Sequence, residues 1–314
     1  MHSLPGFTDI AAYHAWRADA SRWLPAAADM ARGHALPAPS HVFARGTNLV
    51  AALGDTAVLK IYPPLLRHQF VSERAALTQL ARSLSVAIPQ IVAEGEHDGW
   101  PYLIITRLAG TAANDAWPTL SEAEKERVIG ELGAVIAQVQ RVPVGALSAL
   151  EPRWHEFIPR QIAGCRAHHE RRGLPRHFLD GLEVFVRDAA SLIPREPQVI
   201  LTGEYVPENL MLARGAGGWH LAGLIDFGDV MTGFGDYDLL GPSVFMTAGV
   251  PRRVAALLHG YGYADTDMTP ALRRRLMLLM LLHRFSDPVR HMQIEGWQKA
   301  GSLEELERLI WPIA

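Results

Sequence analysis

The chain contains the stretch Thr202-Gly203-Glu204-Tyr205-Val206-Pro207-Glu208-Asn209-Leu210, followed by Leu224-Ile225-Asp226-Phe227-Gly228-Asp229. It carries a carboxylate at Glu204, an amide five positions later at Asn209, and an isolated carboxylate at Asp226 after an apolar run. One carboxylate can orient an attacking hydroxyl, and an amide with a second carboxylate can hold Mg²⁺ beside a transferred phosphate. This layout is typical of a phosphoryl-transfer site.

Short apolar runs surround these residues. They lie at 199–201, 210–213 and 221–225, and Gly-rich residues 214–218 separate the last two. A hairpin that turns there would place the start of one strand beside the end of the other. Asn209 precedes the first of these strands and Asp226 follows the second. We therefore expect their oxygens to come together as Mg²⁺ ligands, with Glu204 in the loop just before them.

The first third of the chain supplies complementary groups. Lys60 is a lone charge in the apolar run Ala57-Val58-Leu59-Lys60-Ile61-Tyr62. A buried Lys needs a partner, and the natural candidate is Glu73 on the following helical segment. A Lys held in this way can bind the α- and β-phosphates of a nucleotide. Upstream, Gly46-Thr47-Asn48 reads as a turn between strands whose backbone N–H groups could cover phosphates.

The spacing of apolar residues changes after the segment 108–111, and we expect this segment to connect two structural regions. Before it, apolar spacing predicts short strands and two helical segments; after it, helices dominate, and Ser121 with Glu124 fits a capping box. The expected strands of the first region are 41–43, 49–53, 57–62, 91–94 and 102–106, and its expected helices are 8–35 and 70–84. In the second region we expect helices over 119–142, onward to about 191, and from 251 to the end.

The amino-acid composition excludes several classes of protein. The chain has 314 residues, 49% hydrophobic and 20% charged, with a formal net charge of −3, which argues against a general nucleic-acid binder. Cys165 is the only cysteine, so an internal disulfide and a Cys-based zinc site are excluded. We see no signal peptide, and the strongest apolar run, 276–282, is too short to cross a bilayer. These features predict no membrane partner and a cytoplasmic location.

The order of Gly turn, strand Lys, helix Glu, crossing segment, catalytic loop and metal Asp resembles the aminoglycoside phosphotransferase and choline kinase-like group, within the protein-kinase-like fold. The resemblance covers roughly residues 40–290. Within the group, the segments that look most like the hygromycin B phosphotransferases are Ala44-Arg45-Gly46-Thr47-Asn48, Val58 to Tyr62, Trp100 to Gly110, and Ile225 to Asp229.

This resemblance implies an α+β, bilobal fold. Residues 1–107 would form an antiparallel β-sheet N-lobe with an N-terminal helical extension that binds nucleotide, and residues 108–314 a mainly helical C-lobe with the catalytic loop, the metal site and the acceptor pocket. The donor would be ATP or GTP, and the acceptor a hydroxyl of an aminoglycoside-like antibiotic. The implied residues are Lys60 at the phosphates with Glu73 orienting it, Asn209 and Asp226 at Mg²⁺, Glu204 at the acceptor hydroxyl, and Thr106, Arg107 and Leu108 along the adenine-binding hinge.

Two departures leave alternatives open. The family's loop is His-Gly-Asp followed by Asn, whereas here it is Thr202-Gly203-Glu204 followed by Asn209. A misplacement of about 1 Å at such a site can cost on the order of 10²-fold in rate. The alternatives are a catalytically impaired nucleotide-binding pseudokinase, or a kinase of another natural product or metabolite alcohol. The oligomeric state is left open.

The region 201–240 is acidic, with six carboxylates and one basic residue, Arg214. Such a region suits metal ions and a cationic substrate. Asp236 and Asp238 are expected either to form part of a solvated acidic rim or to brace the loop after Asp226.

Overall fold

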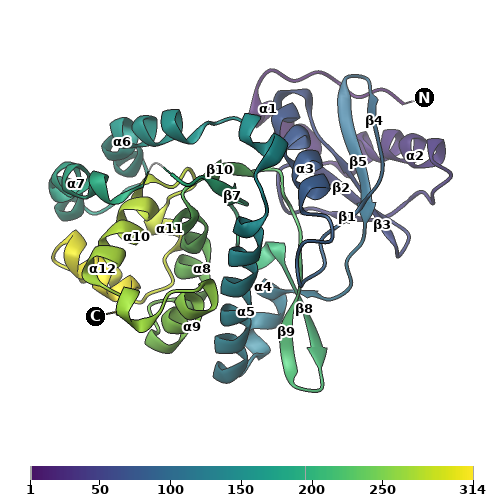
Figure 1. Cartoon of the computed structure of the whole chain (residues 1–314). Helices are drawn as coiled ribbons and strands as arrows, with labels where there is room; N and C mark the ends of the chain where they lie inside the picture. Colours follow the sequence, from purple (N-terminus) through teal and green to yellow (C-terminus); the bar gives the residue numbers. More distant parts are fainter. Residues whose placement is uncertain (1, 195, 314) are drawn as a thin grey trace. The chain divides into compact units, whose positions relative to one another are not determined.

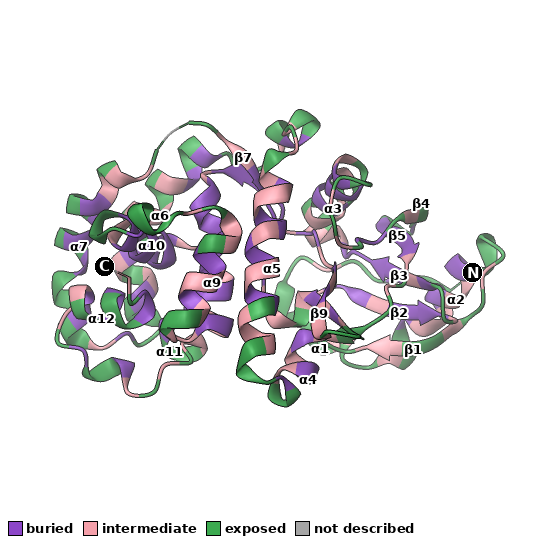
Figure 2. Cartoon of the chain, turned by 60° about the horizontal axis from the view of Figure 1, so that its bottom comes forward, coloured by how far each residue is buried: buried purple, intermediate pink, exposed green. Residues whose placement is uncertain are grey.

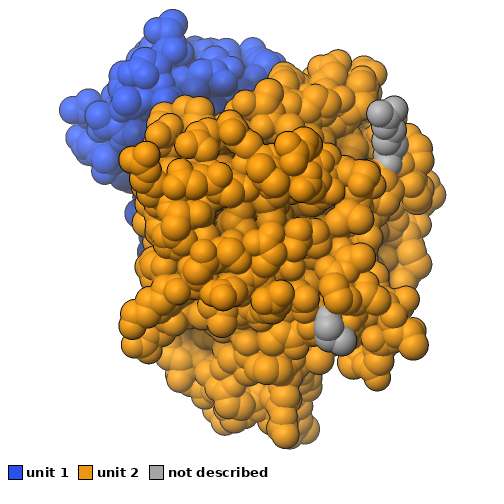
Figure 3. Space-filling view, turned by 90° about the vertical axis from the view of Figure 1, so that its left-hand side faces the viewer, with its two compact units in different colours: residues 1–81, 87–109, 224–229 blue, residues 82–86, 110–223, 230–314 orange. Residues whose placement is uncertain are grey.

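The computed structural model describes residues 2–194 and 196–313. The chain divides into two compact units (Figure 3). The first unit contains the chain up to Ala81, Ala87–Ala109 and Leu224–Asp229, and the second contains Arg82–Val86, Gly110–Gly223 and the chain from Val230 onward. The segment that carries Asp226 therefore belongs to the first unit, although it lies far along the sequence.

The first unit is built on a five-stranded sheet in the order β1-β2-β3-β5-β4, with every neighbouring pair antiparallel (Figure 1). β2 and β3 have mostly buried residues, so this part of the sheet is covered on both faces (Figure 2). In the register, Lys60 of β3 lies opposite Val50 and Leu103. The strands are β1 (Pro39–Phe43), β2 (Leu49–Leu53), β3 (Ala57–Ile61), β4 (Ile91–His97) and β5 (Trp100–Thr106).

Three helices accompany this sheet: α1 (Ile10–Arg17), α2 (Leu24–Gly33) and α3 (Arg67–Leu80). The single helix expected over 8–35 is wrong, because the chain is interrupted between α1 and α2. There, the Asp19 side chain accepts the N–H of Ser21 and starts a short 3₁₀ turn, and Pro25 stands at the start of α2. A side chain that accepts backbone N–H groups and a proline at a first turn are both helix-starting features, so they divide the apolar pattern.

The second unit is mainly helical. Its longest helix, α5, begins with the predicted capping box, in which Ser121 and Glu124 bond reciprocally. α5 packs against α9 at a close approach, since a Cβ on Gly133 would lie 2.4 Å from the Leu257 carbonyl oxygen. The helices are α4 (Ala113–Ala116), α5 (Glu122–Arg141), α6 (Trp154–Arg171), α7 (Arg176–Ala189), α8 (Leu240–Pro242), α9 (Pro251–Tyr261), α10 (Pro270–Leu282), α11 (Pro288–His291) and α12 (Leu303–Ile310).

The apolar run 276–282 forms the second half of α10 and is entirely buried, so it is a core helix (Figure 2). Among the described residues, no helix combines the length and the apolar character that a membrane crossing requires.

The short strands of the second unit form two sheets. The first has the order β6-β8-β9, which contains the predicted hairpin between β8 and β9; in the second, β7 pairs antiparallel with β10. β10 is only three residues long, too short for a periodic signal. The bounds are β6 (Thr111–Ala112), β7 (Val199–Leu201), β8 (Leu210–Gly215), β9 (Gly218–Leu224) and β10 (Met231–Gly233).

Candidate active site

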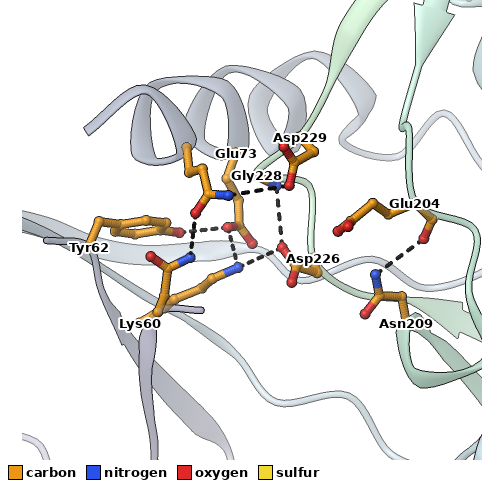
Figure 4. A network of polar contacts seen from close by, with 10 residues as sticks. Lys60, Tyr62, Glu73, Glu204, Asn209, Asp226, Gly228 and Asp229 are labelled. Carbon is orange, nitrogen blue, oxygen red and sulfur yellow. Dashed lines mark hydrogen bonds and ion pairs between the residues drawn. The ribbon is translucent and has the colours of Figure 1, made fainter. Parts of the chain in front are cut away.

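A buried ion-paired cluster lies in the first unit. The Lys60 Nζ donates to Glu73 Oε2 at 2.5 Å and to Asp226 Oδ1 at 2.8 Å (Figure 4). Lys60 is 5% exposed and Glu73 is 0% exposed, and the Tyr62 hydroxyl donates to the same Glu73 oxygen at 2.7 Å. The contact predicted between Lys60 and Glu73 is present. β3 supplies the Lys and α3 supplies the Glu, and the loop after β9 adds Asp226.

The charges in this cluster are set by opposing effects. Burial lowers the pKa of Lys60, but the Asp226 and Glu73 carboxylates outweigh it and hold this pKa above its ordinary value. Burial raises the pKa of Asp226, but the Lys60 ammonium outweighs it, and the net pKa is lowered. At Glu73 burial dominates, so its pKa is raised despite Lys60. Lys60 is therefore cationic and Asp226 anionic at neutral pH, as phosphate and metal ligands need to be.

Asp226 is the accessible member of the cluster, with a side chain that is 34% exposed. Its backbone has φ +65°, in the left-handed region that Asp tolerates better than most residues. The Gly228 N–H lies 3.4 Å from its Oδ1, and a Cβ on Gly228 would lie 3.3 Å from the Gln69 Cβ. Strained backbone of this kind concentrates at functional sites. No sequence pattern shows this conformation.

The turn between β1 and β2 presents backbone donors. Gly46 has φ +84°, and in the described part of the chain the N–H groups of Gly46, Thr47 and Asn48 donate no hydrogen bond. Successive unpaired N–H groups in a turn suit an anion such as phosphate. The buried Asn48 side chain donates to Gln69 Oε1 at 3.0 Å, and Gln69 Nε2 donates to Asp229 Oδ2 at 3.3 Å. This relay ties the turn to the segment that carries Asp226.

The predicted hinge residues follow directly from β5. The Thr106 N–H donates to the Gln90 carbonyl at 2.9 Å, and the Arg107 N–H donates to the Thr56 carbonyl at 2.8 Å. Both donors are therefore engaged within the first unit and are not free for an adenine base. Their role, with that of Leu108, stays a prediction.

The loop that carries Glu204 belongs to the second unit and is held from two directions. The Thr202 N–H donates to Asp238 Oδ2 at 2.9 Å, and the Gly203 N–H donates to Asp238 Oδ1 at 3.0 Å. Further along, Asn209 Nδ2 donates to the Glu204 backbone carbonyl at 3.2 Å (Figure 4). The backbone before and at Glu204 is thus fixed, while its side chain is partly exposed.

Asp236 and Asp238 correct the expectation for the acidic region. Both are buried, at 2% and 3% exposed, so neither lies on a solvated rim. Asp238 binds the loop before Glu204, and Asp236 accepts from Arg275 Nε at 2.7 Å and the Tyr263 hydroxyl at 2.6 Å. Their carboxyl groups make internal contacts, because buried polar groups require such partners. Sequence reasoning missed Asp238 as a residue that supports the loop, since its partners are backbone N–H groups.

The predicted residues thus fall into two groups. Lys60, Glu73 and Asp226 are brought together within the first unit, and Glu204 and Asn209 within the second. The expected proximity of Asn209 and Asp226 stays a prediction.

At a pH above about 7, where Asp238 is ionised and both of its oxygens accept, replacement by Asn should lower turnover at least about tenfold. An amide offers one acceptor oxygen where two N–H groups need two, and an unmatched buried donor costs about 1–3 kcal/mol. The affinity for nucleotide should be unchanged. Asp180→Asn, at an exposed position of α7, is the matched control. Steady-state kinetics check this expectation, and equal loss in both variants would contradict it.

The same variant has a pH signature. Burial raises the pKa of Asp238 to about 7, although the N–H groups of Gly203 and Thr202 oppose this. The folded state therefore retains a proton that the unfolded chain releases near its ordinary pKa of about 4. The contribution of Asp238 to the free energy of unfolding should therefore fall as the pH rises from about 4 to about 7, and this contribution should be absent from Asp238→Asn. Urea titrations across that range measure the difference.

Comparison with known proteins places this geometry in a family. The model of the APH phosphotransferase enzyme family matches residues 42–278. Among solved structures, the GDP complex of aminoglycoside 2′-phosphotransferase-IIIa is similar with a TM-score of 0.66 and 17% identity, covering 90% of this chain and 96% of that one. An APH(2″) enzyme solved with GDP and kanamycin has a TM-score of 0.62 and 21% identity, over 86% and 93% of the two chains.

A third similar structure is the aminoglycoside phosphotransferase APH(3″)-Id from Streptomyces rimosus, with a TM-score of 0.54, 14% identity, and coverage of 84% of this chain and 97% of that one. At such identities the likeness shows the fold, and the predicted α+β protein-kinase-like fold is confirmed. The predicted enzyme class, a phosphotransferase with an alcohol group as acceptor, is confirmed by the family match. Since that match spans well over half of its length, the chain belongs to the phosphotransferase enzyme family.

Proposed function

We propose that the protein transfers the γ-phosphate of ATP or GTP to a hydroxyl of an aminoglycoside-like antibiotic, and that it confers resistance by this modification. The observation that carries the proposal is the Lys60–Asp226 pair, a buried ammonium bonded to a partly exposed carboxylate within the same unit as a turn of unpaired N–H groups. Phosphoryl transfer depends mainly on positioning and on charge neutralisation, and these groups supply both.

In this proposal the first 107 residues bind the nucleotide, and residues 108–314 hold the catalytic loop and the acceptor. Lys60 neutralises charge on the nucleotide phosphates, and Glu73 fixes the position of its ammonium. The N–H groups of Gly46, Thr47 and Asn48 cover the phosphates, and Thr106, Arg107 and Leu108 border the adenine. Glu204 accepts a hydrogen bond from the attacking hydroxyl and takes its proton as the new phosphate ester forms, while the bond to the γ-phosphorus of the nucleotide breaks and the nucleoside diphosphate leaves.

The residues proposed for Mg²⁺ fit that ion. Asp226 is ionised and partly exposed, and only its Oδ1 bonds to other described residues, which leaves Oδ2 for a metal. Asn209 uses its Nδ2 on the Glu204 carbonyl, so its amide oxygen can act as a ligand. Mg²⁺ prefers oxygen ligands of these kinds and is usually held by one or two side chains together with phosphates. When bound, the ion would neutralise charge that develops on the transferred phosphoryl group.

The acceptor class rests on charge and resemblance. Glu208 is exposed and Glu204 is partly exposed on the same loop, which suits a polyamine sugar. The similar structures include enzymes named for aminoglycosides, one of them solved with kanamycin. Within this acceptor class, an acceptor like hygromycin B is favoured by sequence. The segments that resemble hygromycin B phosphotransferases are residues 44–48, 58–62, 100–110 and 225–229. We expect the enzyme to act in the cytoplasm, where nucleoside triphosphates are available.

A second candidate is a nucleotide-binding protein with impaired turnover. The specific observation in its favour is Glu204 itself, which adds a methylene on a loop whose backbone is fixed by Asp238 and Asn209. A kinase of another natural product or metabolite alcohol is the remaining alternative.

Nucleotide binding is tested first. ATP or GTP at millimolar concentration with Mg²⁺ should raise the melting temperature by several degrees, since a ligand at 100 times its Kd adds about 2.7 kcal/mol to the free energy of unfolding. Nucleoside monophosphate with Mg²⁺ is the control. No shift with either triphosphate would contradict both nucleotide candidates. Expression in a sensitive host, screened across aminoglycosides and other drug classes, then identifies the acceptor, and a phosphorylated drug in the culture confirms turnover.

A further inference from the structure

The N-terminal helix α1 lies outside the segment that the family model matches, yet it contacts the turn that is proposed to cover phosphates. The Tyr13 hydroxyl donates to the Thr47 carbonyl at 2.8 Å. Arg17 Nη2 donates to the Asn48 carbonyl at 3.1 Å, and the Ala44 carbonyl lies 3.4 Å from the same nitrogen. Tyr13 and Arg17 are four residues apart, so they share one face of α1.

This helix is firmly fixed within the first unit. The Asp9 carboxylate caps its start by accepting the N–H groups of Ala11 and Ala12. Tyr13 is 0% exposed and packs in an aromatic cluster with Phe7 and Trp100. At the other end, Trp23 Nε1 donates to the Arg17 carbonyl at 3.3 Å. The two side chains that reach the turn therefore start from a rigid base.

The Tyr13 hydroxyl is a permanent donor. Burial raises its pKa well above the ordinary value, and the neighbouring Arg17 only partly opposes this. It therefore keeps its proton across the physiological range, and the Thr47 carbonyl is the acceptor.

The geometry points to Tyr13 and Arg17 as positioning residues for nucleotide phosphates, an inference that rests on the proposed function. A trans peptide has its C=O and N–H on opposite sides. Holding the Thr47 carbonyl against Tyr13 turns the N–H of Asn48 away from α1. Gly46, at φ +84°, has a backbone that can adopt several conformations at little cost, and the contacts with α1 hold the turn in one orientation of its donors. Preorganised donors bind a ligand more tightly because less conformational freedom is lost on binding.

The two residues differ in what they supply. Tyr13 provides one neutral hydrogen bond to Thr47. Arg17 places a single nitrogen, Nη2, near two carbonyls, those of Asn48 and Ala44, on either side of the turn. A lysine at position 17 would keep the charge, but its shorter side chain would hold the ammonium farther from these two carbonyls.

The test uses Tyr13→Phe and Arg17→Ala in the full chain. Each should raise both the Kd for Mg²⁺-nucleotide and the KM for nucleotide about three- to tenfold, which corresponds to the loss of one or two hydrogen bonds. The kcat should stay within about twofold, because neither residue touches the reacting groups. Arg22→Ala is the matched control, because Arg22 is exposed and bonds only to Asp19 among the described residues. Binding is measured well below the melting temperature of each variant, so that a loss of stability does not affect the Kd.

The outcomes separate this inference from the proposed function. If the wild type binds no nucleotide, the proposed function fails and this inference falls with it. If the wild type binds nucleotide and both variants bind it as tightly as the wild type does, only the role of α1 is wrong. Arg17→Lys should recover part of the affinity; full recovery would mean that charge, and not the held carbonyls, sets affinity, which would overturn the inference. A Kd in Arg22→Ala raised as much as in Arg17→Ala would also overturn it.

Discussion

Asp226→Ala should reduce turnover by about a thousandfold or more and remove the dependence of nucleotide binding on Mg²⁺. The substitution deletes the partly exposed carboxylate that pairs with Lys60 and is proposed as a metal ligand. It also places alanine at φ +65°, which costs on the order of 1 kcal/mol for a residue other than Gly, Asn or Asp. Kinetics with titrated Mg²⁺ and nucleotide titrations in its presence and absence measure both effects.

Asp226→Asn separates charge from backbone conformation. Asparagine tolerates the left-handed region as Asp does, and its size is almost the same, so the fold should be retained. Lys60 keeps Glu73 as a partner, which prevents an unpaired buried charge. We therefore expect a loss of turnover similar to that of the alanine variant, with a smaller loss of stability. Asp55→Ala, at an exposed position in the turn between β2 and β3, is the control. An Asp226→Asn variant that keeps Mg²⁺-dependent turnover within tenfold of the wild type would contradict the metal assignment.

The contact between Lys60 and Glu73 could be predicted because the energetic rule behind it is strong. A lone ammonium in an apolar strand cannot remain unpaired, and Glu73 was the natural carboxylate on the following helix. The third partner, Asp226, was identified only by its motif, because a residue 166 positions away has no local signal that it bonds to Lys60.

Other features depend on tertiary structure and had no periodic signal. The apolar spacing continues across Asp19, so it does not predict the division of residues 8–35 into α1 and α2. The Asp19 side chain caps the short 3₁₀ turn between them, but Asp also occurs inside helices, so its presence alone does not predict a break. The role of Asp238 was missed because its partners are the backbone N–H groups of Thr202 and Gly203, which every non-proline residue has. The contacts of α1 with the β1–β2 turn could not be predicted either, because Tyr13 and Arg17 donate to backbone carbonyls, which every residue has.

Glu204→Gln should lower turnover by about 10²- to 10⁴-fold, the usual contribution of a general base, because the amide cannot take the proton of the acceptor hydroxyl. Nucleotide binding should be unchanged, since the Glu204 side chain is not proposed to contact the phosphates. Glu183→Gln, at an exposed position of α7, is the control. Single-turnover measurements with saturating nucleotide test this expectation; if turnover survives the change, Glu204 is not the base.

Glu204→Asp decides between an adapted and an impaired enzyme. The backbone around position 204 is fixed, by Asp238 at Thr202 and Gly203 and by Asn209 at the Glu204 carbonyl, so the loop cannot advance to offset a shorter side chain. If the loop is built for Glu, removing one methylene withdraws the carboxylate by about 1 Å or more, and turnover should fall by about 10²-fold. If the family's usual Asp instead raises turnover, the loop is built for Asp and the natural chain is the impaired form. We expect the fall, because nothing else in the nucleotide cluster around Lys60 departs from what phosphoryl transfer requires.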